Sequence, residues 1–189
     1  NLNNNDGALT TYLNFQYGKR GSYDHLKSDR FFATDSVLSQ DALTNYTGHN
    51  FYFGYGIGYQ INKKWEINYD GRLSYNKTDN TSRNLSEIKQ ISTGNIATSF
   101  ETEIENVGNN HSINQGGNLK YKIDSLGSEW TTDLSWTYAP NRNKQLFNSG
   151  DGEFDNKLHF FSAQTNLLKK LGTKTTFETG IKTTIVDFE

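Results

Sequence analysis

The chain has 189 residues, of which 33% are hydrophobic and 14% aromatic, and its mean hydropathy is −0.81. Its formal charge of −2 lacks the basic excess of a nucleic-acid-binding protein, so no nucleic-acid partner is expected. Cysteine is absent, which excludes a disulfide framework, a thiolate nucleophile and a cysteine-ligated zinc site. The aromatic content argues against disorder, and the abundance of Asn and Thr without helical periodicity predicts an all-β chain.

A first strand is predicted near the N-terminus by apolar and aromatic residues of one parity, namely Leu9, Leu13, Phe15 and Tyr17. The sequence Gly-Lys-Arg-Gly at 18–21 predicts a turn after it. A second strand is expected at about 22–37, although apolar and polar residues alternate poorly there. A long polar link at 39–48 then follows.

The clearest pattern is a hairpin over residues 51–76, with a short link at 62–64. Odd positions of this segment are almost all apolar or aromatic, whereas even positions from 66 to 76 are all polar. Such alternation is typical of strands with one apolar and one polar face. The run Gly54-Tyr-Gly-Ile-Gly58 superficially matches a nucleotide-binding loop, but it lies inside this strand pattern, so we interpret its glycines as small wall residues.

Two further hairpins are predicted in the second half of the chain. The first joins a strand ending at Asp124 to a strand at 129–138 through a turn at 125–128. The second joins about 157–168 to 174–188 through a turn at 169–173. The complete pattern predicts an antiparallel up-and-down meander of about eight strands.

The predicted connections alternate in length along the chain. Turns near 18–21, 62–64, 124–128 and 169–173 are short, whereas links near 39–48, 77–110 and 140–156 are long and polar. Short turns at one end and long loops at the other are typical of bacterial outer-membrane barrels. We expect the link at 77–110 to contain strand extensions beyond the membrane.

Aromatic residues near the strand ends support this interpretation. Trp65 and Tyr75 lie ten residues apart on one face, which is roughly 33 Å along a strand. A tilt of about 40° reduces this to roughly 25 Å, the height of the apolar band between two aromatic girdles. The sequence therefore predicts part of a transmembrane β-barrel, with residues 1–189 forming a single barrel segment.

The alternation assigns individual residues to the two faces. Those expected to face lipid are Phe53, Tyr55, Ile57, Trp65, Ile67, Tyr69, Leu73, Tyr75, Trp130, Leu134 and Trp136. Those expected to face a lumen are Glu66, Asp70, Arg72, Lys120, Lys122, Asp133, Glu178 and Lys182. In a soluble sandwich the second set would face solvent instead.

No residue pattern indicates catalysis or a cofactor, and the chain is not expected to be an enzyme. The carboxylates of Asp151, Glu153 and Asp155 are a weak calcium candidate, and a solvated acidic loop is the favoured interpretation. The four histidines are dispersed in sequence and form no zinc-binding pair.

Three stretches resemble the outer-membrane β-barrel region of Bacteroidetes-type TonB-dependent receptors. They are FYFGYGIGYQINKKWEINYDGRLSYN (51–76), NLKYKIDSLGSEWTTDLSWTY (118–138) and NLLKKLGTKTTFETGIKTTI (166–185). The resemblance implies an internal barrel fragment without plug domain or TonB box, located in the bacterial outer membrane. Its expected partners are outer-membrane lipid, the remaining strands and plug of the parent barrel, TonB through that plug, and an unknown small substrate.

The function implied is the wall of a barrel for nutrient uptake by gated passage. Two alternatives remain open at the level of sequence. One is a self-contained small outer-membrane barrel that serves as an adhesin or anchor. The other is a soluble all-β ligand-binding module, such as a lectin-like sandwich.

Overall fold

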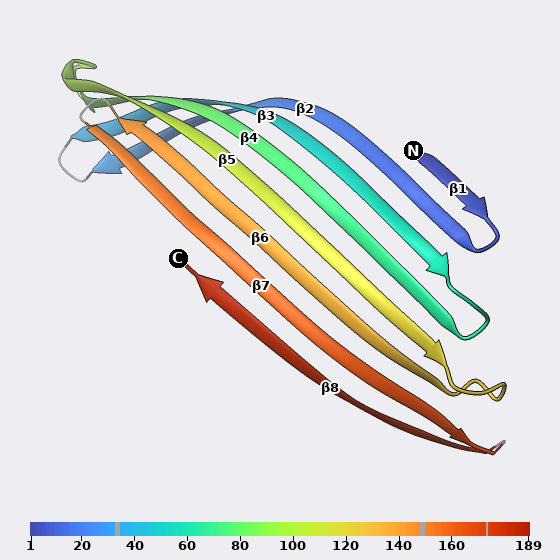
Figure 1. Ribbon diagram of the computed structural model, residues 1–189. Coiled ribbons are helices and arrows are strands. Elements are labelled where there is room, and N and C mark those ends of the chain that lie inside the picture. The colour runs from blue at the N-terminus through green and yellow to red at the C-terminus, as the bar shows by residue number, and fades with distance from the viewer. Residues whose placement is uncertain (33–34, 148–149, 173) are drawn as a thin grey trace.

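The computed structural model describes residues 1–32, 35–147, 150–172 and 174–189. They form one antiparallel sheet whose eight strands follow one another in sequence order (Figure 1). The strands are β1 (Leu2–Asp6), β2 (Leu9–Phe32), β3 (Ser36–Gln60), β4 (Trp65–Gln90), β5 (Ile96–Lys122), β6 (Glu129–Phe147), β7 (Gly150–Leu171) and β8 (Thr175–Phe188). The all-β, eight-stranded antiparallel meander predicted from the sequence is confirmed.

The backbone register aligns the apolar positions of each strand with those of its neighbours. Phe53 stands opposite Leu73, and Leu73 stands opposite Ile113. On the next strands, Leu134 stands opposite Ala163. Because directly paired residues point to the same side of a sheet, the apolar residues of neighbouring strands form one continuous face.

The sheet is a single layer without a hydrophobic core. No hydrophobic side chain of the described residues is buried, and the side chains that are fully buried are those of Ser86 and Ser128. No second sheet covers either face in the part of the chain that the structure describes. The packed core of a two-layer sandwich is therefore not formed by these residues. The described ranges also contain no helix that is long and apolar enough to cross a membrane.

Both edges of the sheet are open. β1 pairs only with residues 9–13 of β2, and β8 pairs only with β7. Within the described ranges, no backbone pairing joins the first two strands to β8, as a closed eight-stranded barrel requires. The outer edges of β2 beyond residue 13 and of β8 thus carry main-chain groups available to a further strand.

The predicted turn at 18–21 is wrong. These residues lie inside β2, whose pairing with β3 runs without interruption from Leu9 opposite Tyr59 to Phe32 opposite Ser36. Gly18 and Gly21 flank two charged residues and so resemble turn chemistry, yet both occupy extended backbone. β1 was missed because its four-residue Asn-Asn-Asn-Asp run is a turn-like composition. The count of eight survives because β1 is gained while the strands predicted at 9–17 and 22–37 merge.

The long polar links predicted at 39–48 and 140–156 are wrong as loops, whereas the strand extensions expected within 77–110 are confirmed. β3, β4, β5, β6 and β7 continue through them, and the connection from β4 to β5 spans only 91–95. Polar residues occupy both faces of these extensions, so no apolar alternation reveals the strands. The predicted elements that include residues 33–34, 148–149 and 173 lie outside the described residues at those positions.

The turn between β5 and β6 is fixed by one carboxylate. The Asp124 carboxylate accepts hydrogen bonds from the backbone N–H groups of Leu126 at 3.0 Å and Ser128 at 3.1 Å. The Lys169 ammonium donates to the same side chain at 2.9 Å and ties the turn to β7. This ammonium, with the donors from Ser128 and Leu126, holds the pKa of Asp124 well below its ordinary range.

We expect this turn to make stability depend on pH. Because the folded-state pKa of Asp124 is depressed, its contribution is present above the unfolded pKa near 4 and is lost as pH falls below it. Urea unfolding of the full-length protein at stepped pH should show the Asp124→Asn variant less stable than wild type at neutral pH. The difference should shrink under acid, and a difference that stays constant with pH would contradict this role.

Candidate functional site

The strand register separates the two sets of site residues predicted from the sequence. Every residue expected to face lipid lies on one side, here called the apolar face. Every residue expected to face a lumen lies on the other side, here called the polar face. The sets were therefore grouped correctly by parity, and their contact with lipid and lumen remains a prediction.

The polar face carries a line of hydrogen bonds that crosses three strands. Asn68 on β4 donates to Glu66 at 3.1 Å and to Asn118 on β5 at 3.3 Å. Asn118 in turn donates to Asp133 on β6 at 2.7 Å. Sequence reasoning missed both asparagines, although each has the parity of the polar face. Amides linked in this way present a hydrophilic wall with fixed orientation.

The glycines of β3 make room for larger side chains on this polar face. A Cβ atom at Gly56 would meet the Tyr12 ring at 2.2 Å, and one at Gly54 would meet the Tyr52 hydroxyl at 2.9 Å. Gly58 likewise lies beneath Asn68. These glycines admit close packing, as predicted, and their place in a barrel wall stays a prediction.

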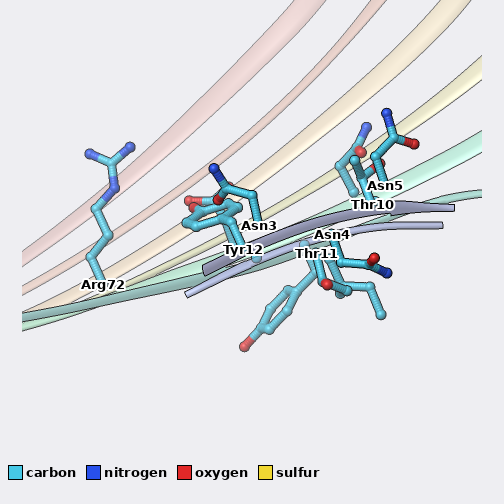
Figure 2. A pocket seen from close by; sticks show the side chains of 13 residues that line it. Asn3, Asn4, Asn5, Thr10, Thr11, Tyr12 and Arg72 are labelled. Carbon is cyan, nitrogen blue, oxygen red and sulfur yellow. The ribbon is translucent and has the colours of Figure 1, made fainter. Parts of the chain in front are cut away.

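A shallow cleft of about 540 Å³ lies on the polar face beside β1. Figure 2 shows Asn3, Tyr12 and Arg72 pointing to one side of the sheet, whereas Asn4 and Thr11 point to the other. Arg72 forms no ion pair with any described residue and stands free of the sheet. This surface offers amides, hydroxyls and one unpaired guanidinium, which suit binding or passage of polar, hydrated solutes and include no nucleophile–base pair.

A polar cluster interrupts the middle of the apolar face. The side-chain oxygen of Gln115 accepts hydrogen bonds from the hydroxyls of Tyr55 at 3.0 Å and Tyr69 at 2.5 Å. Tyr55 reaches Gln115 by lying across Gly71, where a Cβ atom would meet its ring at 2.3 Å. Sequence reasoning missed this cluster, yet Gln115 shares the parity of Ile113 and thus stands out as a polar residue on the apolar side.

Two rows of aromatic residues bound the apolar face. The row nearest the β3–β4 turn contains Trp65, whose ring lies 4.5 Å from Tyr121 and 6.4 Å from Trp130. The opposite row, here called the distal aromatic row, comprises Tyr17, Phe51, Tyr75, His111, Tyr138 and His159. Its neighbouring rings lie 4.6–6.0 Å apart where they pair.

The histidines, although dispersed in sequence, are partly gathered by the fold. His111 and His159 belong to the distal aromatic row, and His49 lies immediately beyond it, bonded through Nδ1 to the Tyr17 hydroxyl at 2.9 Å. Only the register of strands far apart in sequence could reveal this arrangement. The described residues contain no group of three or more His, Asp or Glu able to hold a metal ion.

The calcium candidate lies on β7, on the apolar-face side beyond the distal aromatic row. Its three carboxylates face cations of β6: Asp151 lies 3.5 Å from Lys144, while Glu153 and Asp155 lie 3.3 and 3.0 Å from Arg142. The expected acidic loop is thus a strand, and Arg142 and Lys144 compensate two of its three negative charges. The geometry gives no support to calcium binding.

No protein-family model and no curated protein matches the chain. Among solved structures, it is similar to the ferripyoverdine receptor of the outer membrane of Pseudomonas aeruginosa, with 7% identity and a TM-score of 0.41. The match covers 96% of this chain and 37% of the receptor, so the chain spans little more than a third of that protein.

A second similar structure is the alcaligin outer-membrane receptor FauA from Bordetella pertussis, with 9% identity and a TM-score of 0.35. There the match covers 96% of this chain and 36% of the receptor. Both of these solved structures are bacterial outer-membrane receptors. The meander itself rests on the register of its strands, since TM-scores below 0.5 do not establish a shared fold.

Proposed function

We propose that this chain forms part of the wall of an outer-membrane barrel of the TonB-dependent receptor type, in which it separates lipid from a polar lumen. The observation that carries the proposal is the uncovered apolar face of a single-layer sheet. Large apolar side chains such as Phe53, Ile67 and Leu134 are 37%, 44% and 49% exposed, and no described element packs on them. In water such a continuous surface is unfavourable, whereas in hydrocarbon it is the required lining.

The dimensions of the apolar face support the same proposal. Its height between the two aromatic rows, from Trp65 to Tyr75, is about 25 Å after strand tilt. About 9–11 residues of a tilted strand cross a bilayer, yet β4 contains 26. Roughly 15 of these extend past the distal aromatic row, or about 50 Å along the strand. They would project from the cell as a long hairpin with β5.

The polar face would line the lumen of the parent barrel. Its amides, hydroxyls and charged groups suit a water-filled interior or contact with a plug, and the passage involves no covalent chemistry. The open edges of β2 and β8 would continue into the remaining strands of the wall. Transport energy would reach the barrel through TonB and the plug, and the turn motifs of the sequence favour the Bacteroidetes type. The substrate class would be a small polar nutrient.

Leu134 and Ser135 provide the test, because they are adjacent, exposed and on opposite faces. The chain has no cysteine, so single cysteines can be introduced into the full-length protein at either position and labelled with bimane. In vesicles containing doxyl-labelled lipid, we expect strong quenching at position 134 and weak quenching at 135. Absence of quenching at both positions would overturn the membrane assignment, and equal quenching would overturn the division into two faces.

A further inference from the structure

A cationic group lies directly beyond the distal aromatic row on the apolar-face side. Lys19 pairs in register with His49, and His49 pairs with Lys77, so the three side chains occupy neighbouring strands at one level. Neighbouring strands are about 4.8 Å apart, which places the two lysines on either side of the imidazole, within reach of one small anion. We call these residues the Lys–His–Lys row.

The two lysines of this row have no acidic partner. Neither forms an ion pair with a described residue, and both are exposed. The nearest carboxylate in register is Asp79, two residues beyond Lys77 on the same face, and it makes no ion pair with that lysine. The positive charge of the row is therefore uncompensated within the described part of the sheet.

On the apolar-face side, the other cations beyond the distal aromatic row have acidic partners. Arg142 pairs with Asp155, and Lys157 pairs with Glu189 at 3.0 Å. Lys144 lies 3.5 Å from Asp151. The contrast shows that excess charge is concentrated at one side of the sheet, where β2 and β3 meet β4.

The aromatic residues below the row fix its depth. The hydroxyl of Tyr17 bonds to His49, and the hydroxyl of Tyr75 donates to Asn109 at 3.0 Å, one level further from the apolar band. Both tyrosines thus keep their rings in the band and their hydroxyls toward the polar side, as interfacial tyrosines do. If the apolar face meets lipid, the Lys–His–Lys row lies at the level of the headgroups.

We propose that the Lys–His–Lys row binds the phosphate of a lipid headgroup in the leaflet that the distal aromatic row enters. This inference rests on the proposed function. Two flexible ammonium groups can close on one phosphate, while the ring of His49, held by Tyr17, adds a further polar contact. Charge complementarity selects a lipid whose phosphates give it a net negative charge over a zwitterionic or neutral lipid.

The test uses the full-length protein, purified in dodecyl maltoside and titrated with bisphosphorylated lipid A. Bound lipid is counted by native mass spectrometry, with dephosphorylated lipid A as the comparison. We expect the phosphorylated form to bind more tightly to wild type, and the Lys19→Gln/Lys77→Gln variant to bind it about 30-fold more weakly, the order expected for two lysines at an anionic lipid surface.

A matched control is the Lys144→Gln/Lys157→Gln variant, which removes two lysines of the same face that already have carboxylate partners. It should bind lipid A as wild type does. Equal weakening by both double variants would overturn the proposal, as would equal binding of the two lipid forms by wild type. Bimane quenching at position 134 tests the membrane assignment separately, so a negative lipid A result with strong quenching rejects this site alone.

Discussion

Leu73→Arg should impair insertion of the full-length protein, whereas Arg72→Leu should leave it largely intact. Leu73 lies in the middle of the apolar face, opposite Phe53 and Ile113. An arginine on the lipid side at mid-membrane depth costs about 2–4 kcal/mol of folding free energy. Arg72 belongs to the polar face and has no ion-pair partner among the described residues, so its loss breaks no salt bridge there.

Folding into vesicles, followed by urea titration and by the gel shift of the unheated protein, measures this difference. The two substitutions are made at adjacent positions of one strand and exchange the same two residue types, so each serves as the control for the other. A stable Leu73→Arg variant together with an Arg72→Leu variant that fails to insert would show that the two faces are reversed. Folding of the wild-type protein as a soluble monomer without lipid would reject the membrane assignment.

The fold could be predicted from the sequence where apolar and polar residues alternate along a strand. Between residues 51 and 76 the odd positions must be apolar, and the hairpin, its turn and its two faces were all predicted correctly. In the extensions beyond the distal aromatic row, both faces are polar. Apolar and polar residues therefore do not alternate in these strands, and Gly18 and the Asn-rich stretches resemble turns in composition.

The candidate site shows the same division. Asp70, Arg72 and Asp133 were assigned to the polar face by parity alone, and the register agrees. The Lys–His–Lys row and the distal aromatic row could not be predicted. Their members come from different strands, and the relative register of these strands depends on turns that were predicted at the wrong positions. With the turn at 18–21, Lys19 would leave the sheet, whereas the continuous β2 sets it beside His49.

Gly71→Val should destabilise the sheet by disturbing the polar cluster at the centre of the apolar face. Gly71 is buried beneath the ring of Tyr55, and an added Cβ would lie 2.3 Å from that ring. Displacement of Tyr55 removes its hydrogen bond to Gln115, and in the proposed membrane location no water would replace that bond. Overpacking of this kind costs about 1–3 kcal/mol, and the unpaired hydroxyl adds to that cost.

Gly117 supplies the matched control, because it lies on the same face of β5 opposite Tyr69, and a Cβ there meets no atom within 4 Å. Gly117→Val should therefore change the urea midpoint of the full-length protein in vesicles much less than Gly71→Val. The Tyr55→Phe background separates the two causes, because the clash with the ring persists there while the hydroxyl is gone. Gly71→Val should therefore cost less stability in Tyr55→Phe than in wild type, and the cost that remains is that of the clash. If Gly71→Val proves as mild as Gly117→Val, the ring of Tyr55 can move at no cost, and the close packing over Gly71 does not stabilise the sheet.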